Sequence, residues 1–292
     1  MFAGSHTAIV TPFRNGAIDE ESLHKLVDFQ FENGITGVVP CGTTGESPTL
    51  DHDEHTKVVK LTAQFAKGRG LVMAGTGSNS TREAVELTKA AQDAGATAIL
   101  QVAPYYNKPT PEGLLQHFKQ VAQATTLPIM LYSIPGRCGI EIGIDTVVKL
   151  HEICPNICAI KEAGGNPERV SQMKQVLPPS FEILSGDDSL TLPFMSVGAV
   201  GIVSVASNLI PRQISDLVKL ALQGDFAGAL KIHQKYYPLL AAFLKLSTNP
   251  IPIKTAMALA GHVGPELRLP LVGMDAAKTA ELEKTLRELG LI

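Results

Sequence analysis

Ile157-Cys158-Ala159-Ile160-Lys161-Glu162-Ala163 is one of eight short apolar runs that recur along the chain. The runs are rich in Val, Ile, Leu and Ala and read as continuous rather than alternating, a pattern typical of parallel strands buried on both faces. Amphipathic stretches with helical spacing separate them. The predicted strands are His6–Phe13, Gly37–Gly42, Leu71–Gly77, Ala98–Tyr106, Pro128–Pro135, Ile157–Ala163, Phe181–Asp188 and Gly201–Ser207.

Eight strand–helix units at intervals of roughly 20 to 35 residues match a (β/α)8 barrel, whose usual length is about 250 residues. The alternative is a doubly wound open sheet, which usually has a glycine-rich first turn between strand and helix. The segment Pro12-Phe13-Arg14-Asn15-Gly16 is a poor candidate for such a turn. We therefore predict the α/β class, with a TIM barrel that spans residues 1–224.

The last seventy residues or so form a different pattern, without strand-like runs. We expect residues 225–292 to form a helical appendage that packs on the barrel or on another subunit. Its three predicted helices are Asp225–Lys245, Pro250–Ala260 and Ala276–Leu289. Within the barrel, Asp51-His52-Asp53-Glu54 and Ser80-Thr81-Arg82-Glu83 match the capping box that opens many helices.

Composition excludes several classes of function. A net charge of −3 leaves no nucleic-acid footprint, and the apolar runs are too short to span a membrane. The start of the chain, Met1–His6, lacks the pattern of a signal peptide, so we expect a cytoplasmic protein. The cysteines form no CxxC pair, and although Cys154 and Cys158 resemble half of a metal site, we expect free thiols and no metal. The four are Cys41, Cys138, Cys154 and Cys158.

Lys161 closes the apolar run Ile157–Ile160 and should lie at the inner end of a buried strand. Burial disfavours the charged form of an amine, so a lysine is costly there. A lysine near neutrality is a nucleophile that can condense with a ketone as a Schiff base. The alternative is a charged lysine that extends into the following loop.

Tyr132 precedes Lys161 by one strand–helix repeat, so the two should occupy neighbouring strands at similar height. Adjacent strands lie about 4.8 Å apart, which lets a phenol and an amine reach one substrate. Schiff-base formation needs proton transfers that a positioned tyrosine can relay. The alternative is a core tyrosine whose hydroxyl bonds to a backbone carbonyl.

The remaining candidates follow other strands, at the barrel face where active sites lie. Gly42-Thr43-Thr44-Gly45 resembles a carboxylate cradle, since free N–H groups ahead of a helix favour an anion; an ordinary turn is the alternative. Arg137 could hold a second carboxylate or be a solvated loop residue. Asp187-Asp188 is more simply a helix cap than a metal site.

Two further groups have no assigned chemistry from the pattern alone. Tyr105 and Tyr106 are consecutive on a predicted strand and should point to opposite sides. His52 and His55 share a helix face, and the helix N-terminus should disfavour their protonation. They could form a polar ligand site or be plain solvated histidines.

Four motifs together resemble the dihydrodipicolinate synthase family, within the pyruvate-dependent class I aldolases, over essentially the whole chain. The motifs are Gly42-Thr43-Thr44-Gly45-Glu46-Ser47, Pro104-Tyr105-Tyr106-Asn107-Lys108-Pro109, Tyr132-Ser133-Ile134-Pro135-Gly136-Arg137 and Lys161-Glu162-Ala163. The resemblance implies a homotetramer built as a dimer of dimers, no cofactor, and condensation of pyruvate with L-aspartate 4-semialdehyde. Sister aldolases, such as N-acetylneuraminate lyase or 2-keto-3-deoxy sugar-acid aldolases, and a silent binding protein on the same fold are the rivals.

The resemblance also implies residue roles. Lys161 would form the imine with pyruvate, and Tyr132 would relay protons with help from Thr43 and from Tyr106 of a neighbouring subunit. The Thr43–Thr44 backbone would hold the carboxylate of pyruvate, and Arg137 that of the semialdehyde. Gly186 and Ile202 would line the substrate pocket. Feedback L-lysine would bind at a set of six residues: Ser47, His52, His55, Asn79, Glu83 and Tyr105.

Four residues depart from the family pattern. They bear on the fit of the substrate and on the affinity for L-lysine, and none touches an assigned catalytic role. They are Ser133 in place of a common asparagine, Cys138 in place of threonine, Gly164 in place of threonine or serine, and Pro48 in place of alanine.

Overall fold

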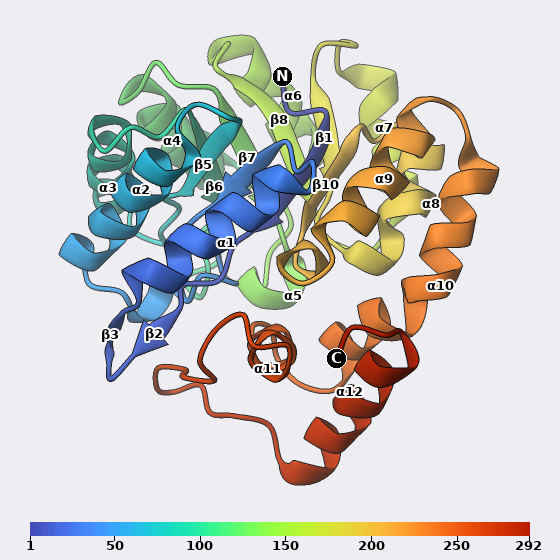
Figure 1. The fold of residues 1–292 in the computed structure, drawn as a ribbon. Helices are drawn as coiled ribbons and strands as arrows, with labels where there is room; N and C mark the ends of the chain where they lie inside the picture. Colours follow the sequence, from blue (N-terminus) through green and yellow to red (C-terminus); the bar gives the residue numbers. More distant parts are fainter.

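The computed structural model covers residues 1–292 and contains a closed barrel of eight parallel strands (Figure 1). The predicted (β/α)8 fold is confirmed. The barrel closes where the first strand pairs with both the second and the last. The strands are β1 (Gly4–Ala8), β4 (Gly37–Val39), β5 (Leu71–Gly75), β6 (Ala98–Val102), β7 (Ile129–Ser133), β8 (Ile157–Glu162), β9 (Glu182–Ser185) and β10 (Gly201–Ser204).

Helices surround the barrel and cover the outer faces of its strands (Figure 1). They are α1 (Glu20–Glu32), α2 (His52–Ala66), α3 (Thr81–Asp93), α4 (Pro111–Gln123), α6 (Ile144–Ile153), α7 (Pro167–Val176), α8 (Thr191–Ser196) and α9 (Pro211–Leu222). Short helical turns sit in the loops after the strands: η1 (Ser47–Thr49), α5 (Pro135–Cys138), η2 (Asp188–Leu190) and η3 (Ala206–Asn208). The capping box predicted at Asp51 is present, with both reciprocal hydrogen bonds to Glu54.

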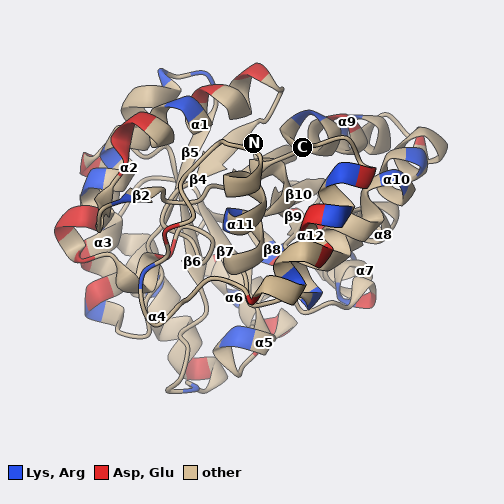
Figure 2. Cartoon of the chain, turned by 60° about the horizontal axis from the view of Figure 1, so that its bottom comes forward, with Lys and Arg blue, Asp and Glu red and all other residues tan.

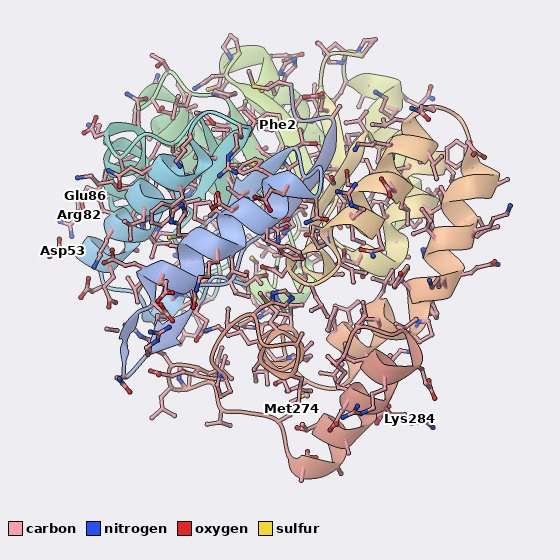
Figure 3. The ribbon with its side chains drawn as sticks, viewed as in Figure 1. Phe2, Asp53, Arg82, Glu86, Met274 and Lys284 are labelled. Atoms are coloured by element: carbon pink, nitrogen blue, oxygen red, sulfur yellow. The ribbon has the colours of Figure 1, made fainter.

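Two apolar clusters form the core. The larger one lies between the strands and the helices, and the smaller one fills the inside of the barrel. Phe2 belongs to the inner cluster, is fully buried and closes the end of the barrel at which the strands begin. Figure 3 labels Phe2 at that end. The opposite end, where the strands finish, is therefore the one that can hold a site.

The strands end two to five residues earlier than predicted in most cases, because the residues beyond them turn into loops. Strand β6 stops at Val102, so Tyr105 and Tyr106 lie on a loop and the predicted strand alternation does not apply to them. Pro104 cannot donate to a strand ladder, which explains this early end. A small hairpin, β2 (Phe13–Arg14) and β3 (Ala17–Ile18), was not predicted.

The three C-terminal helices are α10 (Phe226–Lys245), α11 (Ile251–Leu259) and α12 (Ala276–Glu288), close to the predicted bounds. They lie beyond the end of the barrel where the strands finish (Figure 1), and in Figure 2 helix α11 lies across the mouth of the strand ring. Met274 and Lys284, labelled in Figure 3, mark this side. The larger core cluster includes residues from both parts, so a domain boundary at residue 224 stays a prediction.

Charged residues of both signs are spread over the outer helices (Figure 2). None of the helices is both long and apolar enough to cross a membrane.

Candidate active site

Lys161 and Tyr132 are neighbours on adjacent strands. The strand register places Tyr132 of β7 opposite Lys161 of β8, and the Lys161 Nζ lies 4.1 Å from the centroid of the tyrosine ring. Both side chains are buried, with exposed fractions of 5% and 6%. The structure thus brings an amine and a phenol together inside the barrel.

The surroundings of Lys161 favour its neutral form. Burial lowers the pKa of its amine from 10.5 to about 7, and the Arg137 cation lowers it further, while the Asp188 carboxylate opposes the shift. About half of the amine is then unprotonated near pH 7, compared with less than a thousandth for an ordinary lysine. A nucleophilic amine is available without a separate base.

Asp188 does not cap a helix, although the sequence predicted a cap for the pair Asp187-Asp188. Asp187 caps the short helix η2 through the Ser189 amide, as the sequence suggested. Asp188 instead is buried and accepts from the Ser204 hydroxyl at 2.5 Å and from the Val205 amide at 2.9 Å. These donors hold a carboxylate close enough to Lys161 to affect the pKa of its amine, although burial raises the pKa of Asp188 itself.

Burial also raises the pKa of the Tyr132 phenol, so the phenol stays protonated over the ordinary pH range. The Thr43 side chain and the Arg137 cation both act in the opposite direction, because each interacts favourably with the phenolate. A protonated phenol between a hydroxyl and an amine can pass a proton in either direction.

The turn after β4 presents two free backbone donors. Within the turn, the amides of Gly45, Glu46 and Ser47 donate to carbonyls of Gly42 and Thr43. The amides of Thr43 and Thr44 donate to no acceptor in the protein. Two adjacent unpaired N–H groups at such a turn can hold an anion.

Arg137 lies on the short helix α5 and lines a cavity that Thr43 and Tyr132 also line. Its Nη2 donates to the Asn249 carbonyl at 3.0 Å, and the Asn249 side chain donates to the Thr44 hydroxyl at 3.0 Å. Arg137 is exposed, and only its Nη2 has a hydrogen-bond partner in the protein, so its other guanidinium donors are free. One residue of the C-terminal segment therefore connects both candidate carboxylate sites.

Gly186 and Ile202 approach the site in different ways. A Cβ atom at Gly186 would lie 3.0 Å from the Lys161 Cε and 2.6 Å from the Ala163 Cβ, so only glycine leaves the lysine in place. Ile202 is fully buried in the outer core cluster, between strands and helices. Its side chain therefore packs away from the barrel interior.

The predicted inhibitor residues gather beside the catalytic candidates. Glu83 accepts from the His52 ring at 2.9 Å and from the Ser78 hydroxyl, and these bonds lower its pKa. The Ser80 side chain accepts from the Glu83 amide, but the Glu83 carboxylate does not reach back to Ser80. The second predicted capping box is thus only half formed, because Ser78 and His52 take the carboxylate.

His52 and His55 differ in spite of their shared helix face. His55 is buried and bonded through its Nε2 to the Gly75 carbonyl at 2.8 Å, whereas His52 is exposed. Burial is the main reason that the pKa of His55 is lowered. The lowered pKa of His55 agrees with the direction expected from the sequence, with burial as its largest cause.

A cavity of about 380 Å³ joins the two groups of candidates. Thr43, Tyr132 and Arg137 line one part of it, and the other part is lined by Ser47, His52, His55, Glu83 and Tyr105. Asn79 stands beside it and donates to the Tyr105 carbonyl at 3.1 Å. Tyr106, in contrast, is 90% exposed and does not line this cavity, and its φ of 74° is left-handed.

Comparison with known proteins agrees with this arrangement. The family model described as "Dihydrodipicolinate synthetase family" matches residues 1–289. The 4-hydroxy-tetrahydrodipicolinate synthase of Persephonella marina is 49% identical over 293 residues, with 100% of each chain covered. This chain belongs to the dihydrodipicolinate synthetase family.

Solved structures of the dihydrodipicolinate synthetase family have the same fold. The 4-hydroxy-tetrahydrodipicolinate synthase from Methylacidiphilum fumariolicum SolV matches with a TM-score of 0.98 at 52% identity, over 99% of this chain and 96% of that one. The enzyme from Cyanidioschyzon merolae, solved with lysine bound, matches with a TM-score of 0.95 at 41% identity, over 100% of this chain and 99% of that one.

The residues that depart from the dihydrodipicolinate synthetase pattern have local roles. Ser133 is fully buried and accepts from the Ile142 amide at 3.3 Å. Cys138 donates to the Ala103 carbonyl at 3.2 Å. The Gly164 amide donates to the Glu162 carboxylate at 2.7 Å, and a Cβ there would clash with that carboxylate. Pro48 and Cys138 both line the cavity.

The sequence did not indicate the contacts that three polar residues of this dihydrodipicolinate synthetase family member make near the site. Asp188 was interpreted as a cap, and Asn249 and Lys254 belong to the C-terminal helical segment, in which no candidate residue was named from the sequence. Lys254 offered a signal, since it is the single charge in the apolar helix α11. A lysine buried among apolar residues is costly, at Lys254 as at Lys161.

Proposed function

We propose that this chain is a 4-hydroxy-tetrahydrodipicolinate synthase. It condenses pyruvate with L-aspartate 4-semialdehyde, the first committed step of the diaminopimelate route to lysine. The observation that carries the proposal is Lys161, a buried amine with a pKa of about 7 against the Tyr132 ring, in a family whose members bear this enzyme name. The reaction needs no cofactor, because the lysine amine itself activates the ketone.

The first half of the reaction builds an enamine on Lys161. The neutral amine attacks the keto carbon of pyruvate, and the resulting carbinolamine loses water to give an imine. Loss of a proton from the methyl carbon then gives the enamine. Each step moves a proton, and the Tyr132 phenol next to the amine is the group that can deliver and collect it.

The second half joins the two substrates. The enamine carbon attacks the aldehyde carbon, whose oxygen takes a proton and becomes a hydroxyl group. The amino group of the former semialdehyde then attacks the imine carbon, and Lys161 leaves as the amine. We assign the proton relay to Tyr132, with Thr43 and Tyr106 of a neighbouring subunit; the exposure of Tyr106 is compatible with a reach across a subunit contact.

Two anion sites orient the substrates in this scheme. The free Thr43 and Thr44 amides suit the carboxylate of pyruvate, because they lie on the turn beside Tyr132. Arg137 at the rim suits the carboxylate of the semialdehyde, since a guanidinium binds carboxylates with two parallel hydrogen bonds. Gly186 gives Lys161 its space, and any role of Ile202 falls to its backbone.

We further propose that L-lysine inhibits the enzyme in the second part of the cavity. Glu83 offers a carboxylate for an ammonium group, and His52, His55, Ser47, Asn79 and Tyr105 surround it with polar groups. A family member with lysine bound supports the ligand class. A cytoplasmic homotetramer, arranged as a dimer of dimers, completes the proposal.

Borohydride trapping tests the proposal directly. The protein is incubated with pyruvate and sodium borohydride, its intact mass is measured, and the adduct is mapped by peptide sequencing. We expect one reduced pyruvate per chain on Lys161. Lys254 is a built-in control, because it is equally buried but ion-paired. A protein that stays unmodified excludes every Schiff-base function.

A second assay identifies the reaction. Aspartate semialdehyde is added to the protein and pyruvate, and the product is analysed by mass spectrometry. We expect the cyclic condensation product. An adduct on Lys161 without this product assigns the chain to a sister pyruvate aldolase instead. The initial rate is then followed against L-lysine, and a flat response at millimolar lysine removes the inhibitor site.

A further inference from the structure

A buried ion pair connects the C-terminal segment to the turn that carries Thr43 and Thr44. The Lys254 amine on α11 donates to the Glu46 carboxylate and, at 2.9 Å, to the Glu266 carbonyl. The second carboxylate oxygen of Glu46 accepts from the Arg268 amide at 3.0 Å. Lys254 and Glu46 have exposed fractions of 0% and 1%, and no step of the proposed reaction uses either.

The neighbours of the pair keep it dry and fixed. The Phe13 ring lies beneath both cations, with its centroid 4.3 Å from the Lys254 Nζ and 4.2 Å from the Arg268 Cζ. The Arg268 guanidinium in turn binds both oxygens of Glu54, at 2.5 and 2.7 Å. Removing two charges from water is expensive, and a buried pair often contributes less stability than apolar residues of the same size. A role in positioning explains its presence better than stability does.

The pair acts on a strained turn. Glu46 has φ and ψ of 55° and 36°, the left-handed conformation that residues with a Cβ seldom adopt. Cys41, at the start of the same turn, also has a positive φ of 56°. Such a conformation persists only where the surroundings hold it. Here the carboxylate of Glu46 is held by Lys254 and by Arg268, both from the C-terminal segment.

The C-terminal segment holds the turn at a second point. Asn249 donates to the Thr44 hydroxyl at 3.0 Å and accepts from Arg137 at 3.0 Å. Asn249, just before α11, and Lys254, within it, are five residues apart and reach two residues of the turn, Thr44 and Glu46. The direction of the Thr43 and Thr44 amides is therefore set by residues more than 200 positions away.

We propose that Lys254 is a positioning residue for the keto-acid carboxylate. Through Glu46 it holds the turn Gly42–Ser47 in the conformation in which the Thr43 and Thr44 amides meet at one anion. The inference rests on the proposed function, since it needs a keto acid bound as an imine at Lys161. It makes the C-terminal segment part of the substrate site, rather than only an assembly element.

The test separates recognition of the carboxylate from reactivity of the amine. The double variant Glu46→Gln with Lys254→Met removes both charges together, so that no unpaired charge stays buried. Borohydride trapping is measured with pyruvate and with pyruvamide, which is a neutral ketone of nearly the same shape. We expect trapping by subsaturating pyruvate to slow by about tenfold, while trapping by pyruvamide stays within about twofold of wild type.

The matched control is the double variant Glu283→Gln with Arg287→Met, which removes an exposed ion pair from α12 of the same segment. It should trap both ketones like the wild type. If the Glu46/Lys254 variant loses both activities in parallel, or keeps both, the positioning role is refuted. Asn249→Ala decides the question should that variant fail to fold, because it removes no buried charge; the same selective loss for pyruvate is expected. A wild-type protein that traps neither ketone refutes the proposed function itself.

Discussion

Replacement of Lys161 by methionine should stabilise the protein while it abolishes the pyruvate adduct. The pKa of this amine is lowered from 10.5 to about 7 because burial disfavours the ammonium form. One pKa unit corresponds to about 1.4 kcal/mol, so keeping the proton on the folded chain costs about 5 kcal/mol. Methionine has a similar length and carries no charge, which removes this cost. We expect a higher free energy of unfolding for the variant near neutral pH.

The pH dependence gives the effect a signature. Below about pH 7 the lysine is protonated in both states and the full cost applies to the folded state. Between about pH 7 and 10.5 the unfolded chain keeps a proton that the folded chain has lost, so the wild type gains stability as the pH rises. The advantage of Lys161→Met should therefore fall from about 5 kcal/mol at pH 6 to about 2 kcal/mol at pH 9.

Urea unfolding at several pH values measures this difference. Far-ultraviolet circular dichroism is the suitable probe, because the chain has no tryptophan. Lys284→Met is the control, since Lys284 is exposed on α12 (Figure 3) and its ion pair lies in water; its stability should match the wild type at every pH. A constant difference between pH 6 and 9, or a variant less stable than the wild type at pH 6, would refute the reasoning.

The other predictions concern catalysis and control. Tyr132→Phe should lower kcat by about a hundredfold or more with a small change in the pyruvate KM, because the ring stays and only the proton relay is lost. A rise in the pyruvate KM as large as the fall in kcat, measured in steady-state assays, would contradict this. Arg137→Ala should raise the KM for aspartate semialdehyde by about 10- to 100-fold. It should also move the pH midpoint of adduct formation upward, since the arginine cation lowers the pKa of Lys161; an unchanged midpoint would argue against that contact. Glu83→Gln should weaken inhibition by L-lysine. The control Glu86→Gln, on the outside of the same helix (Figure 3), should be inhibited by L-lysine as strongly as the wild type.

The architecture was predictable because each strand is buried on both faces. A run such as Ile157–Ile160 has no solvent side, and eight such runs with helices between them leave few alternatives to a barrel. The strand ends were less predictable. Beyond β6, Ala103 is as apolar as the strand itself, so the hydrophobic pattern continues past the last strand residue and only Pro104 indicates that the ladder must stop.

The placement of the site was predictable as far as it follows the repeat. Tyr132 and Lys161 are one unit apart, so the barrel brings them together. The contacts of Asn249 with Thr44 and of Lys254 with Glu46 span 205 and 208 residues and follow no repeat. They depend on how the last helices pack across the mouth of the barrel, which no local pattern records. The contacts of Asp188 with the Val205 and Ala206 amides, which lie on the loop after β10, likewise depend on packing between loops.

Phe2 closes one end of the barrel and leaves the other end as the entrance to the site. Its ring is fully buried among the inner residues at the closed end, so both substrates, the released water and the product all pass through the same mouth. In the proposed reaction pyruvate would be held on Lys161 before the semialdehyde arrives. If the proposed reaction is correct, pyruvate enters first because the imine must form before the aldehyde can be attacked, and the next pyruvate waits until the product has left by the same end of the barrel.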